Sequence, residues 1–222
     1  NLLLDDLFGA QVVWAERETR QHLLEDTVKS AANSGRAPYM IPYGGSNVVG
    51  MMGYYDAIKE LRDEEEREGF NFDWIVTASS SGGTQAGMVL GKQVWQFKGQ
   101  ILGIAIEGTS EELGSTVANL IMENIALNDW GVQFDPDLIL VNDHYTGKGY
   151  GIMGDPEIEA IRMFASLEGL LLDPVYTGRA AAGLIDLVRK GFFNTQEKVL
   201  FWHTGGTPAL FAEPYQTQLQ IR

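Results

Sequence analysis

The sequence has 222 residues, enough to bury a large hydrophobic core, and its 45% hydrophobic and 21% charged residues are ordinary for a globular protein. Thirty acidic residues against 16 basic ones give a net charge of −14, which argues against partners such as nucleic acid or an anionic membrane surface. The sequence contains no cysteine and only three widely spaced histidines, so it offers no disulfide, no thiolate nucleophile and no zinc-binding pattern.

The first 72 residues are expected to alternate between helix and strand. The order is a helix over 2–9, a strand over 10–15, a helix over 18–35, a strand over 38–43 and a helix over 48–69. The last of these helices ends in a run of charged residues, which is most simply a solvated helix end.

From residue 73 onward the pattern is typical of a parallel sheet. The expected order is a strand over 73–78, helices over 85–95 and 111–128 separated by a strand over 100–108, a strand over 137–142, helices over 155–169 and 179–190, and a strand over 198–203. These four strands are almost continuously apolar, as parallel strands are when helices cover both faces of the sheet. Asp155 is expected to cap the helix that follows it. We therefore predict an α/β fold with open, mostly parallel sheets and helices on both faces.

Polar glycine loops adjoin several of these strands, at 44–47, 79–84, 147–154 and 204–207. Each could be a simple turn, but ligands of open α/β sheets bind outside the carboxyl ends of the strands. The loop 79–84 is the best candidate anion site, because Ser81 and Thr84 offer hydroxyl groups and the next helix points its positive end at the loop. No Lys-Ser/Thr pair follows, so a single phosphate fits better than a nucleoside triphosphate. The loop 44–47 is the competing candidate.

Three further features of the sequence bear on its possible chemistry. Residues 149–154 match GxGxxG, but the strand is too far away and the acidic partner is missing, so a nicotinamide site is rejected. Tyr150 and Tyr176 lie in glycine-flanked loops, where a tyrosine either has a structural role, with its hydroxyl bonded to a backbone carbonyl, or transfers a proton or stacks on a flat ligand. Lys92, two turns into a helix, is expected to point to solvent.

Five ordered motifs resemble one enzyme family. They are GGSNVVGMMGY (44–54), SSSGGTQAGM (79–88), GKGYGI (147–152), LLDPVYTGRAAAGLIDLVRKG (171–191) and HTGGTPALF (203–211). Together they resemble the pyridoxal-phosphate enzymes of the D-cysteine desulfhydrase and aminocyclopropane-carboxylate deaminase family, which have the tryptophan-synthase-β-like fold. This resemblance implies that residues 1–53 are the remainder of a small domain and that residues 54–222 form the large cofactor-binding domain.

The resemblance also implies roles for particular residues. Tyr150 and Tyr176 match the two active-site tyrosines of the family. The positions that match its pyridoxal 5'-phosphate contacts are Ser81, Gly82, Gly83, Thr84, Thr177, Thr204 and Gly205. No metal is implied. The expected partner is a small amino-acid substrate, and the protein is expected to be a cytoplasmic homodimer.

Thr177 helps to choose within the family. The aminocyclopropane deaminases carry a glutamate after the tyrosine, where it can protonate the pyridine nitrogen, whereas a neutral hydroxyl suits a less electrophilic ring. The expected reaction is therefore β-elimination from a small amino acid such as D-cysteine or L-cysteate. The products would be pyruvate and ammonia with sulfide or sulfite.

The family's Schiff-base lysine, in an Asn-Lys-x-Arg-Lys segment, has no counterpart among the seven lysines. The chain resembles only the C-terminal two-thirds of the family, so we expect a fragment that is inactive alone. Two alternatives stay open: the cyclopropane deaminase itself, and a truncated, non-catalytic phosphate-binding module.

Overall fold

The computed structural model describes residues 2–16 and 18–220 of the chain. The chain divides into two compact units, Asn1–Tyr43 and Gly44–Arg222. Among the described residues, every helix is too short or too polar to cross a membrane.

The first unit contains two helices, α1 (Leu2–Leu7) and α2 (Arg20–Asn33), and neither has a buried residue. The prediction of strands over 10–15 and 38–43 is wrong, because both segments are irregular or turn-like in the structure. Trp14, for example, is 76% exposed. A strand needs a neighbour for its N–H and C=O groups, and the described residues of this unit offer no partner strand. The second segment also contains two prolines, which cannot donate to a ladder.

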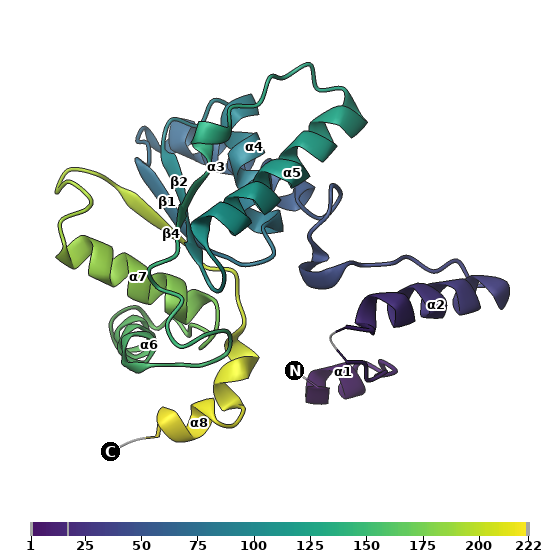
Figure 1. Ribbon diagram of the computed structural model, residues 1–222. Coiled ribbons are helices and arrows are strands. Elements are labelled where there is room, and N and C mark those ends of the chain that lie inside the picture. The colour runs from purple at the N-terminus through teal and green to yellow at the C-terminus, as the bar shows by residue number, and fades with distance from the viewer. Residues whose placement is uncertain (1, 17, 221–222) are drawn as a thin grey trace. The chain divides into compact units, whose positions relative to one another are not determined.

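The second unit is built on a parallel sheet of four strands, in the spatial order β3-β2-β1-β4 (Figure 1). The strands are β1 (Trp74–Ser79), β2 (Gln100–Ala105), β3 (Leu140–Asn142) and β4 (Val199–Trp202). In the register, Thr77 of β1 lies opposite Gly103 of β2 and Trp202 of β4. All three strand pairs are parallel, so the predicted α/β fold with a parallel sheet is confirmed.

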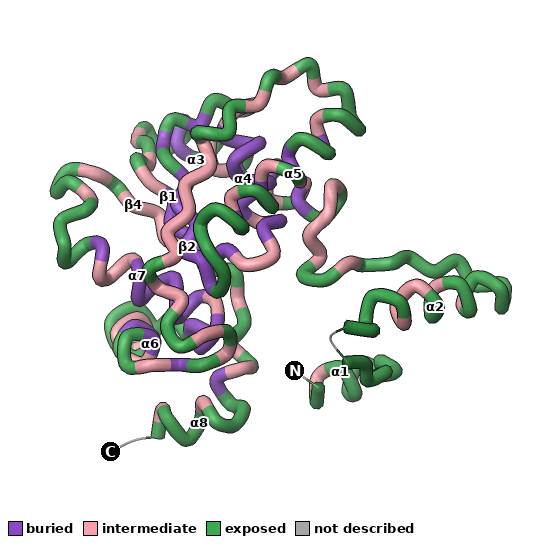
Figure 2. Tube along the Cα trace, in the orientation of Figure 1, coloured by how far each residue is buried: buried purple, intermediate pink, exposed green. Residues whose placement is uncertain are grey.

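Helices cover both faces of this sheet (Figure 1). One face carries α3 (Met52–Glu68), α4 (Gly83–Val94) and α5 (Ser110–Asn128), and the other carries α6 (Asp155–Glu168) and α7 (Thr177–Arg189). Successive residues of β1 point to opposite faces, so Ile75 joins the core under α3 and α4 while Val76 joins the core under α7. Figure 2 shows the buried residues gathered on β1, β2 and the helices that pack on them. A short helix, α8 (Tyr215–Gln218), and the 3-10 turns η1 (Tyr43–Gly45), η2 (Pro136–Leu138) and η3 (Thr207–Phe211) complete the described elements.

The start of α6 differs from the sequence prediction. Asp155 was expected to cap α6, but it is the first helical residue and Gly154 occupies the cap position. The carboxylate of Glu157 accepts the Gly154 N–H at 2.9 Å, so the glutamate satisfies the helix start instead.

Between α3 and α4, Gly87 permits close contact, because a Cβ there would lie 2.1 Å from the Met51 carbonyl oxygen.

Candidate functional site

A small polar cavity of about 100 Å³ lies at the carboxyl end of β1. Its walls come from three separate parts of the chain: the end of β1 with the following loop, the residue before α7, and the residue two places after β4. The lining residues are Ala78, Ser79, Ser80, Ser81, Gly82, Thr84, Tyr176 and Thr204. Parallel strands bring their carboxyl ends to one edge, which explains how such distant segments meet here.

The loop 79–84 supplies most of the hydrogen-bonding groups of this cavity. Gly82 adopts the left-handed conformation (φ 84°) at the N-cap of α4, and no side chain of its own caps the helix there. The first N–H groups of a helix lack intrahelical partners and carry its positive end, so the loop attracts an anion. The Ser79 hydroxyl is buried and makes no hydrogen bond to any residue that the structure describes. The Ser79 hydroxyl is therefore a buried donor available to a bound anion.

The two loops that competed as phosphate sites lie against each other. Ser46, in the loop 44–47, donates from its hydroxyl to Ser81 Oγ at 2.7 Å and accepts the Gly83 N–H at 3.1 Å. A Cβ at Gly83 would approach Ser46 Oγ to 2.5 Å, so this position requires glycine. The loop 44–47 therefore packs against the loop 79–84 and is hydrogen-bonded to it.

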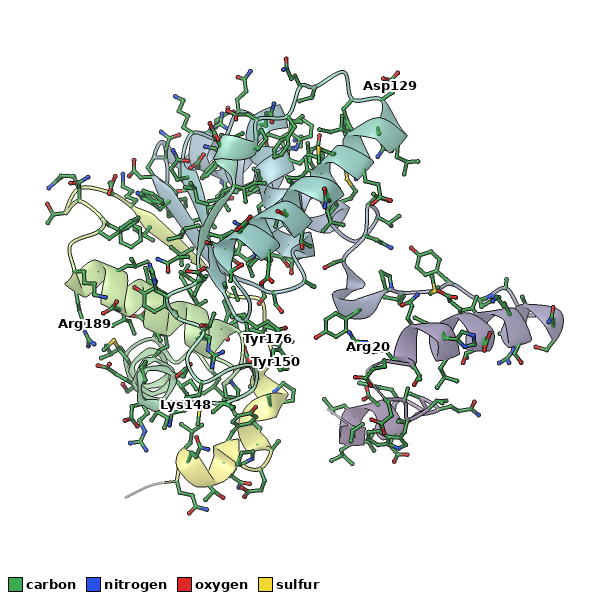
Figure 3. The ribbon with its side chains drawn as sticks, in the orientation of Figure 1. Arg20, Asp129, Lys148, Tyr150, Tyr176 and Arg189 are labelled. Atoms are coloured by element: carbon green, nitrogen blue, oxygen red, sulfur yellow. The ribbon has the colours of Figure 1, made fainter. Side chains whose placement is uncertain are left out.

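Tyr150 and Tyr176 meet through their hydroxyl groups, which are hydrogen-bonded to each other (Figure 3). Their rings pack edge to face with centroids 5.9 Å apart. Tyr176 lines the cavity, whereas Tyr150 is not one of the lining residues and is 45% exposed. The structure thus brings together two tyrosines that lie 26 residues apart.

Thr177 lies differently from Thr204. Thr177 is fully buried; its hydroxyl donates to Asp173 Oδ1 and accepts the Asp173 N–H, both at 2.8 Å. It does not line the cavity, but Thr204 does, and Gly205 follows in the left-handed conformation with open space beside it. Of the two threonines that the resemblance places near the pyridine nitrogen, Thr204 therefore lines the cavity and Thr177 does not.

Asp173 is a residue that the sequence reasoning missed. Its carboxylate is 1% exposed and accepts the N–H groups of Val175 and Tyr176 at 2.8 Å and of Thr177 at 2.7 Å. An aspartate that binds the N–H groups two to four residues ahead is a common start for a helix, so the Asp-Pro just before α7 was the available signal. This turn sets the position of Tyr176.

Lys92 was expected to point to solvent, and that expectation was wrong. The residue is only 8% exposed, and its ammonium donates to the carbonyls of Phe97, Lys98 and Gly99 in the connection between α4 and β2. Burial lowers the pKa of this amine below its ordinary value. No lysine and no carboxylate occur among the described residues that line the polar cavity.

Open α/β sheets bind their ligands at the carboxyl edge, and hydroxyl groups beside a helix N-terminus are suited to an anion. Residues 1–205 match the family described as pyridoxal-phosphate dependent enzyme, and the chain belongs to that family.

Similar solved structures support the same fold. A structure described as an ACC deaminase homologue is 36% identical with a TM-score of 0.82, and the match covers 98% of this chain and 64% of that one. A hydrogen sulfide-producing enzyme from Fusobacterium nucleatum (16% identity, TM-score 0.55) is covered to 66%, with 94% of this chain matched. A serine racemase from Dictyostelium discoideum (16% identity, TM-score 0.56) is covered to 64%, with 92% matched. The chain thus spans about two thirds of the length of these proteins.

The family indicates pyridoxal 5'-phosphate as the cofactor, and the cavity fits its phosphate group. The buried Ser79 hydroxyl has no hydrogen-bond partner among the described residues. At the start of α4, Ser46 Oγ accepts the Gly83 N–H, and Gly82 at the N-cap has no side chain to cap the N–H groups that follow. A phosphate would satisfy the Ser79 hydroxyl and those following N–H groups together with the hydroxyls of Ser81 and Thr84. The lining contains no carboxylate to repel it.

Proposed function

We propose that the natural protein carrying this chain is a pyridoxal-phosphate-dependent lyase that performs α,β-elimination on a small amino acid. D-cysteine would give pyruvate, ammonia and sulfide, and L-cysteate would give pyruvate, ammonia and sulfite. The observation that carries the proposal is the polar cavity in which the loop 79–84, Tyr176 and Thr204 meet. The motifs that the resemblance connects with the cofactor phosphate, the substrate and the pyridine nitrogen converge there.

In this proposal Ser81, Gly82, Gly83 and Thr84 bind the cofactor phosphate through two hydroxyls and the N–H groups at the start of α4. When bound, the cofactor supplies an electron sink for the bond broken at the substrate's α-carbon.

The proposed neighbours of the pyridine nitrogen are uncharged. Thr204 contributes a hydroxyl, and Gly205 has open space beside its backbone. Thr177 acts indirectly, through the hydrogen bond from its hydroxyl to Asp173. A hydroxyl does not keep a ring nitrogen protonated as a carboxylate does. The cofactor would therefore be a weaker electron sink in this site than in a site with a carboxylate. Such a site suits a substrate whose β-substituent is itself a good leaving group.

The tyrosine pair is the proposed proton-handling group on the substrate side. Because the hydroxyls of Tyr150 and Tyr176 bond each other, a proton donated by one can be replaced from the other. The Schiff-base lysine that the reaction needs is not at the cavity wall. We therefore expect the 222-residue chain to bind the cofactor's phosphate without turnover.

One observation favours a second candidate, opening of the aminocyclopropane-carboxylate ring to 2-oxobutyrate and ammonia. The 36% identical relative is described as an ACC deaminase homologue. The uncharged cavity wall favours elimination over ring opening. A weaker electron sink suffices when the substrate carries a good leaving group at its β-carbon, and a cyclopropane carries none. A non-catalytic phosphate-binding module is the third candidate. The homodimer and the cytoplasmic location stay predictions.

The test is an assay of the full-length natural protein, loaded with pyridoxal 5'-phosphate, against D-cysteine, L-cysteate and aminocyclopropane carboxylate. We expect pyruvate from at least one of the first two, and a loss of rate of roughly 10²-fold or more in Tyr176→Phe. The control Tyr145→Phe removes a phenol whose partner is Asp186, away from the cavity. Formation of 2-oxobutyrate without pyruvate would transfer the assignment to the deaminase. No product from any substrate, with the cofactor bound, would leave only the non-catalytic module.

A further inference from the structure

The loop 147–154 has a glycine spacing that the proposed function does not explain. Gly147, Gly149 and Gly151 all have positive φ, at 60°, 120° and 74°. Side chains rarely tolerate these angles, so a backbone of this shape needs glycine at alternate positions. Tyr150 lies between two of these glycines. Two glycines of the GxGxxG match, Gly149 and Gly151, therefore set the backbone path, whereas the third, Gly154, has an ordinary φ of −117°.

The guanidinium of Arg179 lies inside the curve of this loop. Arg179, on α7, is 1% exposed, and its Nη atoms donate to the carbonyls of Gly149 at 3.1 Å and Ile152 at 2.7 Å. A third carbonyl, that of Ile106 just after β2, accepts at 2.9 Å. A Cβ at Gly147 would lie 3.2 Å from Nη2, so this glycine leaves room for the guanidinium.

Glu157 orients the guanidinium from the other side. Its Oε1 accepts the Nε–H of Arg179 at 2.8 Å, and its Oε2 accepts the N–H of Gly154 at the end of the loop. Four of the five N–H donors of an arginine are thus engaged, three of them by backbone carbonyls.

Tyr215 of α8 binds the remaining carbonyl next to the tyrosine. Its hydroxyl donates to the Gly151 carbonyl at 2.6 Å. Burial raises the pKa of this phenol, so it stays a donor at neutral pH. The carbonyls on both sides of Tyr150 are therefore held by side chains from α7 and α8.

We propose that Arg179 and Tyr215 are positioning residues for Tyr150: they hold the 147–154 backbone in the one path that brings the Tyr150 hydroxyl to Tyr176. The relevance of this arrangement to turnover rests on the proposed function. The geometric claim itself does not, because it concerns residues within this chain alone.

The alternative is that these side chains only stabilise the fold. An arginine with that role alone would alter the whole unit evenly when replaced. A positioning role has a local consequence: loosening the loop separates the two phenols, and the shared hydrogen bond between Tyr150 and Tyr176 is lost.

The experiment uses the 222-residue chain without cofactor or substrate, with its tyrosines labelled at the phenolic carbon for NMR. Tyr215→Phe removes one hydroxyl and keeps the ring, and Arg179→Lys keeps the charge but not the fork of donors. The matched control is Tyr145→Phe, because Tyr145 donates to Asp186 at 2.7 Å and not to the loop. Amide hydrogen exchange is followed in residues 149–154 and, as an internal reference, in β1 and β2.

We expect exchange in residues 149–154 to rise roughly tenfold in Tyr215→Phe and further in Arg179→Lys, relative to β1 and β2. The pH titrations of Tyr150 and Tyr176 should change with it, and the control should change neither. Equal acceleration of the loop and the strands, or unchanged tyrosine titrations in both variants, would overturn the proposal. A natural protein with no lyase activity would refute the proposed function and leave these measurements unaffected.

Discussion

Arg179 and Glu157 form an ion pair between α7 and α6, with 2.8 Å between Nε and Oε1 and side-chain exposures of only 1% and 6%. The same two helices carry a second pair, Arg189 with Glu159, whose side chains are 53% and 47% exposed. The interface between α6 and α7 thus contains one buried and one exposed arginine–glutamate ion pair.

This contrast leads to a stability prediction. Arg179→Met leaves Glu157 Oε1 and three backbone carbonyls without the arginine as donor, so we expect the free energy of unfolding to fall by about 3–5 kcal/mol. Arg189→Met should cost far less, because exposed ion pairs contribute little. Urea unfolding followed by circular dichroism measures both. Similar losses in the two variants would contradict the importance assigned to burial.

The contact between α3 and α4 makes a second prediction. Gly87→Ala places a Cβ 2.1 Å from the Met51 carbonyl oxygen, so the helices must separate, and we expect a loss of about 1–3 kcal/mol. Gly53→Ala is the control, since a Cβ there meets nothing within 4 Å and alanine favours the helix. That variant should gain about 0.5–1 kcal/mol. Thermal unfolding of both proteins should shift the melting temperature in opposite directions, and a shared direction would disprove the packing argument.

Cofactor binding by the loop 79–84 can be tested without a Schiff-base lysine, by using pyridoxamine 5'-phosphate as the probe. Ser81→Ala removes one hydroxyl from the cavity wall. A hydrogen bond to a charged group contributes about 1.5–3 kcal/mol, so the dissociation constant should rise roughly 10-fold or more in calorimetry.

Two controls belong to this measurement. Ser115→Ala changes an exposed serine on α5 and should leave the affinity unchanged. Pyridoxamine without phosphate should bind equally weakly to the parent chain and to Ser81→Ala. If Ser81→Ala binds the phosphorylated probe as tightly as the parent does, the loop is not the phosphate site.

Asp143 predicts a pH dependence. Its Oδ2 accepts the N–H of Ser110, the first residue of α5, at 2.7 Å, and this hydrogen bond holds the pKa of the carboxyl below its ordinary value of 3.8. A carboxylate with a lowered folded-state pKa stabilises the protein above its unfolded pKa, and the gain is lost as the pH falls through the folded-state pKa.

Melting temperatures of the parent chain and of Asp143→Asn, measured from pH 2 to pH 7 (roughly the range of carboxyl titration), test this. The parent should be more stable at neutral pH, and the difference should shrink as the pH falls below the ordinary aspartate pKa. A difference that is constant with pH would show that the carboxylate contributes no pH-dependent stability.

Much of the second unit follows from local sequence. The apolar runs of β1 and β2 and the helices around them were predicted because burial on both faces leaves a pattern in the chain itself. The loop 79–84 was likewise recognisable, since serines and glycines before a helix are the local requirement of an anion site. The irregular segments 10–15 and 38–43 show the limit of such reasoning, because a β-branched or aromatic run becomes a strand only beside a partner.

The sequence by itself therefore determined the order of elements in the second unit, its parallel sheet and the chemistry of single loops. Only the tertiary structure decided that Tyr176 and Thr204 share a cavity with Ser81, that Thr177 turns inward to Asp173, and that Lys92 is buried. The physical reason is the same in each case. Propensity and periodicity are properties of neighbouring residues, whereas a buried hydrogen bond depends on which distant donor and acceptor the packing of the sheet and helices brings within 3 Å of each other.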